Sequence, residues 1–202
     1  AQFPSSNITS VLQSVTFPVL SKMQREEYRL TESYKILLRL SAFVVFPLMI
    51  GLAAVADPFI RLVLTDKWEG TIPLLQILCF SLMWHLVHVI NLDLLQVKGR
   101  SDYFLKLELI KKVILGFSVL GVTIPMGLTA MCLGQLFVSV LSLPINTFYT
   151  KKTIGYGFCS QMKDLLPILI HSLLMGVVVY GCTLLVGGNG FKLIIGVLIG
   201  AA

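Results

Sequence analysis

Residues 72–100 read IPLLQILCFSLMWHLVHVINLDLLQVKGR, and this stretch decides the fold class. Its apolar part, residues 73–95, has the length of roughly 20 residues that a helix needs to cross the hydrocarbon core of a bilayer. A basic sequence, QVKGR, follows directly. Because lipid offers no partner for backbone polar groups, such a run must be helical. The stretch therefore predicts a transmembrane helix that ends in a basic connection.

Similar apolar runs fill the rest of the chain. Of its 202 residues, 56% are hydrophobic and 13% are charged, whereas soluble domains average about 25% charged residues. The mean hydropathy is +0.87. Besides residues 73–95, we expect spans near residues 5–23, 36–55, 113–126, 128–148 and 165–186, and a truncated seventh after the turn GGNG. The prediction is an all-α polytopic transmembrane helix bundle, with residues 1–202 as a single transmembrane domain. The chain begins without Met and ends inside an apolar run, so we expect a fragment.

The basic residues are distributed unevenly between the connections. Of the 16 Lys and Arg, thirteen lie in residues 22–39, 98–112 and 151–163, which are alternate connections, and only Arg61, Lys67 and Lys192 lie in the others. Such an excess marks cytoplasmic loops. The net charge of +6 therefore reports topology, and it does not indicate a nucleic-acid partner. The predicted location is the bacterial inner membrane, with the bilayer as a partner.

Residues 5–23 form the least apolar of the expected spans. Thr9, Gln13 and Thr16 recur at helical spacing opposite an apolar stripe. Polar side chains in a span prefer the bundle interior or a water-filled cavity, so this pattern favours a cavity-lining helix. The alternative is an interfacial helix that lies flat. A stripe of hydroxyls and amides without Lys or Arg argues against it.

In the third span, Ser81, His85 and His88 share one helical face, and Asn91 lies at its edge. These residues either line a cavity or are neutral groups hydrogen-bonded inside the bundle. A further histidine, His171, lies in the sixth span, and we expect its ring to be hydrogen-bonded in the interior of the bundle.

The fourth helix is expected to begin near Asp102 and carries Glu108, Lys111 and Lys112 where it enters the membrane. Glu108 precedes the lysines by three and four residues, which favours intrahelical ion pairs. Alternatively, the lysines form a cationic vestibule for a phosphate-bearing headgroup, with Lys112 placed deepest. Arg39 is the last residue of the charged connection 22–39, and we interpret it mainly as part of the basic excess that marks a cytoplasmic loop.

Catalytic and metal-binding patterns are missing from the sequence. It contains no GxSxG, HExxH, P-loop or GxGxxG motif, and no carboxylate pair lies within an expected span. The two histidines of the third span have no nearby third ligand, and the four cysteines are scattered singly. We therefore expect no enzyme activity, no metal and no cofactor.

Several phrases resemble Wzx-type polysaccharide flippases of the multidrug/oligosaccharidyl-lipid/polysaccharide exporter superfamily. In chain order they are SNIT and VTFP of the first span, FPL of the second and PLLQ with HVINL of the third, then LQVKGRSD and LELIKK. The phrases follow the order of the family's C-terminal lobe, and the resemblance extends over roughly residues 1–188.

The resemblance implies a two-lobed bundle with a central cavity that works by alternating access. The substrate would be an undecaprenyl-diphosphate-linked oligosaccharide, moved across the inner membrane for lipopolysaccharide or other surface polysaccharide. The missing N-terminal lobe would complete the cavity. The substrate-cavity candidates on this chain are Gln13, Thr16, Arg39, Ser81, His85, His88, Asn91, Glu108 and Lys112.

Two other functions compete with a flippase. An ion-coupled drug or metabolite exporter of the same superfamily predicts an acidic residue deep in a span, whereas Asp57, Asp93 and Glu108 all lie near expected span ends. A membrane glycosyltransferase or polymerase predicts a large external loop, and the external connections here are short.

Overall fold

Four long helices make up most of the computed structural model, which describes residues 16–117, 121 and 123–185. Within these residues, four segments are long and apolar enough to cross a membrane: Glu27–Ala54, Asp66–Val97, Leu128–Ile154 and Phe158–Thr183. They confirm an all-α multi-pass membrane protein. The expected seventh span and the greater part of the first lie outside the described residues, which begin with a helical segment at 16–22.

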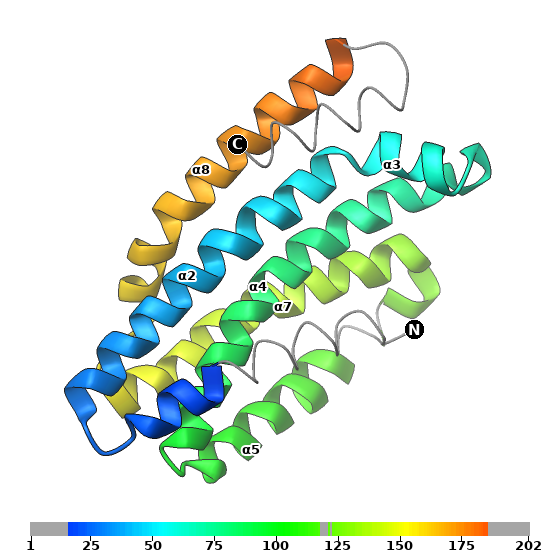
Figure 1. Ribbon diagram of the computed structural model, residues 1–202. Coiled ribbons are helices and arrows are strands. Elements are labelled where there is room, and N and C mark those ends of the chain that lie inside the picture. The colour runs from blue at the N-terminus through cyan, green and yellow to red at the C-terminus, as the bar shows by residue number, and fades with distance from the viewer. Residues whose placement is uncertain (1–15, 118–120, 122, 186–202) are drawn as a thin grey trace.

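The long helices are α2 (Glu27–Ala54), α4 (Ile72–Val97), α7 (Leu128–Ile154) and α8 (Phe158–Leu185). Figure 1 shows them side by side in the order α8, α2, α4 and α7, and the packing of α2 on both α4 and α8 and of α4 on α7 gives the same order. A shorter helix, α5 (Ser101–Leu109), packs on α4 and α7. In this order α2 and α4 lie in the middle, and α7 also contacts α8.

The connections explain how each helix ends. Gly99 and Gly155 have positive φ values of 68° and 73°, a conformation that side chains with a Cβ rarely adopt, and they end α4 and α7 respectively. Pro73 lies in the first turn of α4, where its missing N–H is tolerated. The connections 22–26, 98–100 and 155–157 all lie at one end of the bundle, on the lower left of Figure 1. We call this the basic end.

The opposite end of α2 is followed by α3 (Ala56–Val63) and the 3-10 helix η1 (Asp66–Thr71). The N-cap of α3 is Val55, without a side-chain cap bond. Asp57 binds Arg61 Nε instead, at 2.8 Å, and Asp66 and Glu69 bind the same guanidinium. These hydrogen bonds raise the pKa of Arg61. The side chain of Arg61 therefore links α3 to η1.

Helix α5 continues into a π-helical segment, η2 (Ile110–Gly116). The expected start near Asp102 is confirmed, since α5 begins at Ser101. Residues 118–120 and 122 of the expected fourth span lie outside the described part. π-Helical turns are rare and occur frequently at functional sites. Here the segment carries Lys111 and Lys112.

Burial on α2 follows a single stripe. Tyr34, Leu38, Ala42 and Phe46 are fully buried at intervals of four residues, between α4 and α8. Large apolar side chains on the outer face are more than half exposed, among them Ile36, Leu40, Phe43, Val44 and Leu48. Soluble proteins rarely expose an apolar patch of this extent. An exposed apolar face of this kind fits a helix that lies within a membrane.

Candidate substrate-cavity site

The third-span histidine His88 lies at the contact between α4 and α7. Its Nε2 is 2.9 Å from the carbonyl oxygen of Ser139, and its Nδ1 is 2.7 Å from Nδ2 of Asn146. A carbonyl accepts and an amide NH2 donates, so the ring is neutral with the proton on Nε2. Both ring nitrogens have partners, and the ring is buried.

Ser81 and Ser139 belong to the same contact. The Ser139 hydroxyl donates to the carbonyl oxygen of Ser81 at 3.3 Å and lies 3.5 Å from His88 Nε2. All three side chains are buried. This first polar layer therefore joins α4 to α7 at membrane depth.

A second polar layer lies closer to the basic end and centres on Asn91, which is 1% exposed. Its Oδ1 accepts from Tyr34 at 2.9 Å, from Thr150 at 2.5 Å and from Gln161 Nε2 at 3.1 Å. Its Nδ2 donates to Gln161 Oε1 at 3.2 Å and to the Val87 carbonyl at 2.7 Å. The four side chains come from α2, α4, α7 and α8, so one amide ties all four long helices together.

Thr16 and Asp93 form a third buried contact. The Thr16 hydroxyl donates to Asp93 Oδ2 at 2.6 Å, and the two residues are 2% and 1% exposed. Asp93 therefore lies inside the bundle, although its sequence position is close to the end of α4. This bond also fixes the helical segment 16–22 against α4. Gln13 lies outside the described residues.

The remaining candidates are less enclosed. His85 is exposed on α4, one turn before His88. Glu108 pairs with Lys111 at 2.9 Å and with Lys112 at 3.4 Å, which confirms the predicted intrahelical ion pairs. Lys111 and Glu108 also lie within electrostatic range of both histidines. Glu108 belongs to α5 and Lys111 to η2, so this is a charge interaction of α4 with the segment formed by α5 and η2.

The two lysines of the patch formed by Glu108, Lys111 and Lys112 differ in exposure. The side chain of Lys112 is 79% exposed and that of Lys111 is 14% exposed. Lys111 is therefore the enclosed cation of the pair, and Lys112 is the accessible one.

Arg39 is separate from this group. Its Nη2 binds Asp164 Oδ2 at 2.9 Å and joins α2 to α8. Tyr156 donates a hydrogen bond to the same carboxylate. Burial and this hydrogen bond raise the pKa of Tyr156, so the phenol keeps its proton. Arg39 therefore belongs to a helix contact near the basic end, and its side chain remains 52% exposed.

The interior position predicted for His171 is wrong. The residue is exposed on α8, and its Nδ1 donates to the carbonyl oxygen of Pro167 at 2.6 Å. Within the described residues, no group of three or more His, Cys, Asp or Glu side chains could hold a metal ion.

Sequence reasoning missed the partners contributed by α7. Polar residues recur on α7 at intervals of three and four, at Ser139, Ser142, Asn146 and Thr150, and all four are buried. This is the spacing that drew attention to the first and third spans. The same pattern, applied to the fifth span, would have found Ser139, Ser142 and Asn146, while Thr150 lies two residues beyond the expected end of that span.

A multi-pass helical membrane protein with polar layers between its spans is the class that this fold and site define. Residues 1–73 match a family model described as "Polysaccharide biosynthesis protein". The chain is also similar to the lipopolysaccharide biosynthesis protein WzxC of Escherichia coli (strain K12), with 27% identity over 90% of this chain and 38% of WzxC.

Two further relatives extend this similarity. The teichuronic acid biosynthesis protein TuaB of Bacillus subtilis (strain 168) is 24% identical over 90% of this chain and 38% of its own length. An uncharacterized membrane protein in the cps region of Klebsiella pneumoniae is 26% identical over 89% of this chain and 37% of its own. No solved structure matches.

These matches confirm the resemblance to polysaccharide biosynthesis membrane proteins of the Wzx type. The chain spans less than two fifths of the length of these curated relatives. Its assignment to a C-terminal lobe stays a prediction, and so does the list of substrate-cavity residues.

Proposed function

We propose that the protein takes part in flipping an undecaprenyl-diphosphate-linked oligosaccharide across the bacterial inner membrane, for the synthesis of a surface polysaccharide. The observation that carries the proposal is the similarity to WzxC and TuaB over nine tenths of the chain. The protein would be a transporter and not an enzyme. The remaining part of the transport cavity would come from a second lobe of the same protein.

The polar layers support a transport role because polar groups at membrane depth are costly and rare without one. The candidate residues fall into two groups, one buried and one exposed. His88, Asn91, Ser81 and Thr16 are buried and hydrogen-bonded within the bundle, so they would position the helices. His85 and Lys112 are exposed, and they would be available to a headgroup.

A diphosphate headgroup needs cations, and the charges here allow a specific arrangement. Lys112 extends from η2, while Lys111 and Glu108 largely neutralise each other at 2.9 Å. Lys112 is therefore the cation of this patch that would contact a phosphate.

The function is tested by inactivating the gene in its source bacterium. We expect loss of surface polysaccharide and accumulation of the lipid-linked precursor with its sugars still facing the cytoplasm. The intact gene should restore export. If the precursor reaches the outer leaflet at the normal rate in the mutant, the flippase proposal is wrong.

An ion-coupled exporter of the same superfamily is the second candidate, and the burial of Asp93 favours it. A carboxylate that is 1% exposed and hydrogen-bonded by Thr16 fits the buried acid that such exporters need. The same gene inactivation separates the two candidates. An exporter predicts increased sensitivity to toxic compounds with normal surface polysaccharide.

A further inference from the structure

A cluster of cations and aromatic rings lies at the basic end, apart from the candidate cavity residues. The ring of Tyr103, near the start of α5, has the Arg100 guanidinium 5.0 Å from its centroid and the Lys152 ammonium at 5.2 Å. Tyr149 of α7 packs against Tyr103 with a centroid distance of 5.0 Å. We call Arg100, Tyr103, Tyr149 and Lys152 the tyrosine cradle.

The cradle joins segments that are far apart in the sequence. Arg100 precedes α5, whereas Lys152 belongs to the last turn of α7. Both cations are exposed, and Tyr103 is half-buried. An ordinary excess of lysines in cytoplasmic loops does not require two cations to lie against the same aromatic ring. Two positive charges from separate segments therefore lie close to one ring.

The charges around the cradle are unbalanced. Residues 98–106 and 149–154 contain five cations, Lys98, Arg100, Lys106, Lys151 and Lys152, and one carboxylate, Asp102. Within the part of the chain that the structure describes, none of these five cations forms a salt bridge. The surface is therefore electrostatically matched to an anion.

An apolar stripe runs from the cradle along α5 and η2. Leu105, Leu109, Val113 and Phe117 follow at intervals of four residues, with exposures of 60%, 60%, 51% and 75%. On α7, Phe148 is 64% exposed beside Tyr149. The stripe begins two residues after Tyr103, on a different face of α5, and runs away from the basic end. A ligand with an anionic head and apolar tails would match both parts.

We propose that the tyrosine cradle is a binding site for an anionic phospholipid of the cytoplasmic leaflet. The phosphate lies between Arg100 and Lys152, and the acyl chains lie along the stripe of Leu105, Leu109 and Val113. Basic pockets between spans on the cytoplasmic side are suited to anionic headgroups, and interfacial tyrosines suit the headgroup level. This site is independent of the transported substrate.

The test measures lipid binding to the purified full-length protein in a neutral detergent. Phosphatidylglycerol and phosphatidylcholine are titrated separately, and bound lipids are counted by native mass spectrometry. The wild type should bind the first phosphatidylglycerol more tightly than phosphatidylcholine. The double variant Arg100→Gln/Lys152→Gln should lose about 25-fold in phosphatidylglycerol affinity, at about fivefold for each cation near the surface. Its phosphatidylcholine affinity should not change.

A matched control separates this site from general charge. Arg25 and Lys163 are exposed, carry the same two charges near the basic end and form no salt bridge in the described residues. Arg25→Gln/Lys163→Gln should stay within twofold of the wild type, and the charge-preserving Arg100→Lys should keep most of the affinity. Equal losses in both double variants, or an unchanged lipid preference in the cradle variant, would overturn the proposal.

A further arm separates a lipid from free phosphate. Inorganic phosphate replaces chloride at equal ionic strength during the phosphatidylglycerol titration. We expect no displacement of the lipid. Displacement would show that the cradle is a simple phosphate site, and the lipid assignment would be wrong.

Discussion

The hydrogen bonds of Asn91 lead to a stability prediction that can be worked from the structure. Asn91→Leu keeps the approximate volume but removes the acceptor of Tyr34 and Thr150 and the amide partner of Gln161. Asn91 makes four such bonds between helices, two of them with Gln161. Hydrogen bonds between membrane helices contribute about 0.6 kcal/mol each on average, so four of them contribute about 2.4 kcal/mol. The Tyr34 hydroxyl and the Gln161 amide would also remain buried without that partner, which increases the loss.

The measurement is the free energy of unfolding of the purified protein in mixed detergent micelles, titrated with a denaturing detergent. Gln76→Leu is the matched control, because Gln76 lies on the same helix and donates one hydrogen bond, at 3.2 Å, to the Ala53 carbonyl. It should lose about 0.6 kcal/mol. A double-mutant cycle of Asn91→Leu with Tyr34→Phe should give a coupling energy of about 0.6–1.7 kcal/mol. If Asn91→Leu is no less stable than Gln76→Leu and the cycle is additive, Asn91 does not tie the four helices together.

Three further predictions follow from other contacts. Gly176→Ala should destabilise the α2–α8 contact by about 1–3 kcal/mol, because the added Cβ would meet the Ile50 side chain, whereas Gly181→Ala on the same helix meets nothing and should be neutral or stabilising in the same unfolding titration. His88→Leu should reduce the yield of folded protein, because Ser139 and Asn146 lose their hydrogen-bonding partner. His85 is exposed, so His85→Leu should leave the yield normal and reduce surface polysaccharide. The reverse result would contradict the division between buried and exposed candidates. Asp164→Asn should weaken the α2–α8 contact at the basic end, which is measured as faster amide hydrogen exchange in the first turns of α8, and Arg39→Gln should have the same effect. Normal exchange in both variants would show that the ion pair of Arg39 and Asp164 at 2.9 Å contributes nothing to this contact.

The spans were predictable from sequence, but their full lengths were not. The run expected at residues 36–55 is the C-terminal part of α2, which begins at Glu27, and the run expected at 165–186 belongs to α8, which begins at Phe158. Hydropathy marks only the residues that match the thickness of the hydrocarbon core. The helical backbone continues beyond it into the charged connections. Tyr34 and Gln161 lie in these extensions, which explains why they were not considered as site residues.

Local spacing predicted local contacts and failed for distant ones. The pairs of Glu108 with Lys111 and Lys112 follow from one helical turn and are present. The contact between Arg39 and Asp164 depends on the packing of α2 against α8, and nothing in either segment's own pattern indicates it. The sequence also indicated that His88 was either cavity-lining or hydrogen-bonded. The structure gives it two hydrogen-bonding partners on α7, Ser139 and Asn146.

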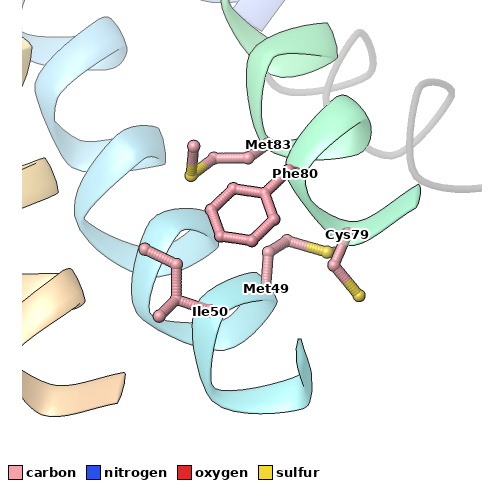
Figure 2. Close-up of a pocket in the computed structure, with 5 residues that line it drawn as sticks. All are labelled: Met49, Ile50, Cys79, Phe80 and Met83. Carbon is pink, nitrogen blue, oxygen red and sulfur yellow. The ribbon is translucent and has the colours of Figure 1, made fainter. Parts of the chain in front are cut away.

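The contacts between helices differ in kind at the two ends of the bundle. Near the basic end, Asn91 supplies directional bonds among four helices. Towards the other end, one hydrogen bond runs from Gln76 of α4 to the Ala53 carbonyl of α2. Most of the contact there is apolar, and Met49, Ile50, Cys79, Phe80 and Met83 line a crevice too narrow to admit a water molecule (Figure 2).

Methionine side chains adapt to irregular gaps at little cost, whereas a lost hydrogen bond leaves a buried polar group without a partner. A conservative change such as Met83→Leu should therefore cost little in the crevice, whereas Tyr34→Phe at the polar layer removes one hydrogen bond to Asn91 and should cost about 0.6–1.7 kcal/mol. Helix α2 carries both kinds of contact on one buried stripe, with Tyr34 near its start and Met49 near its end. Rearrangement of this helix against α4 should consequently cost less at the Met49 end than at the Tyr34 end.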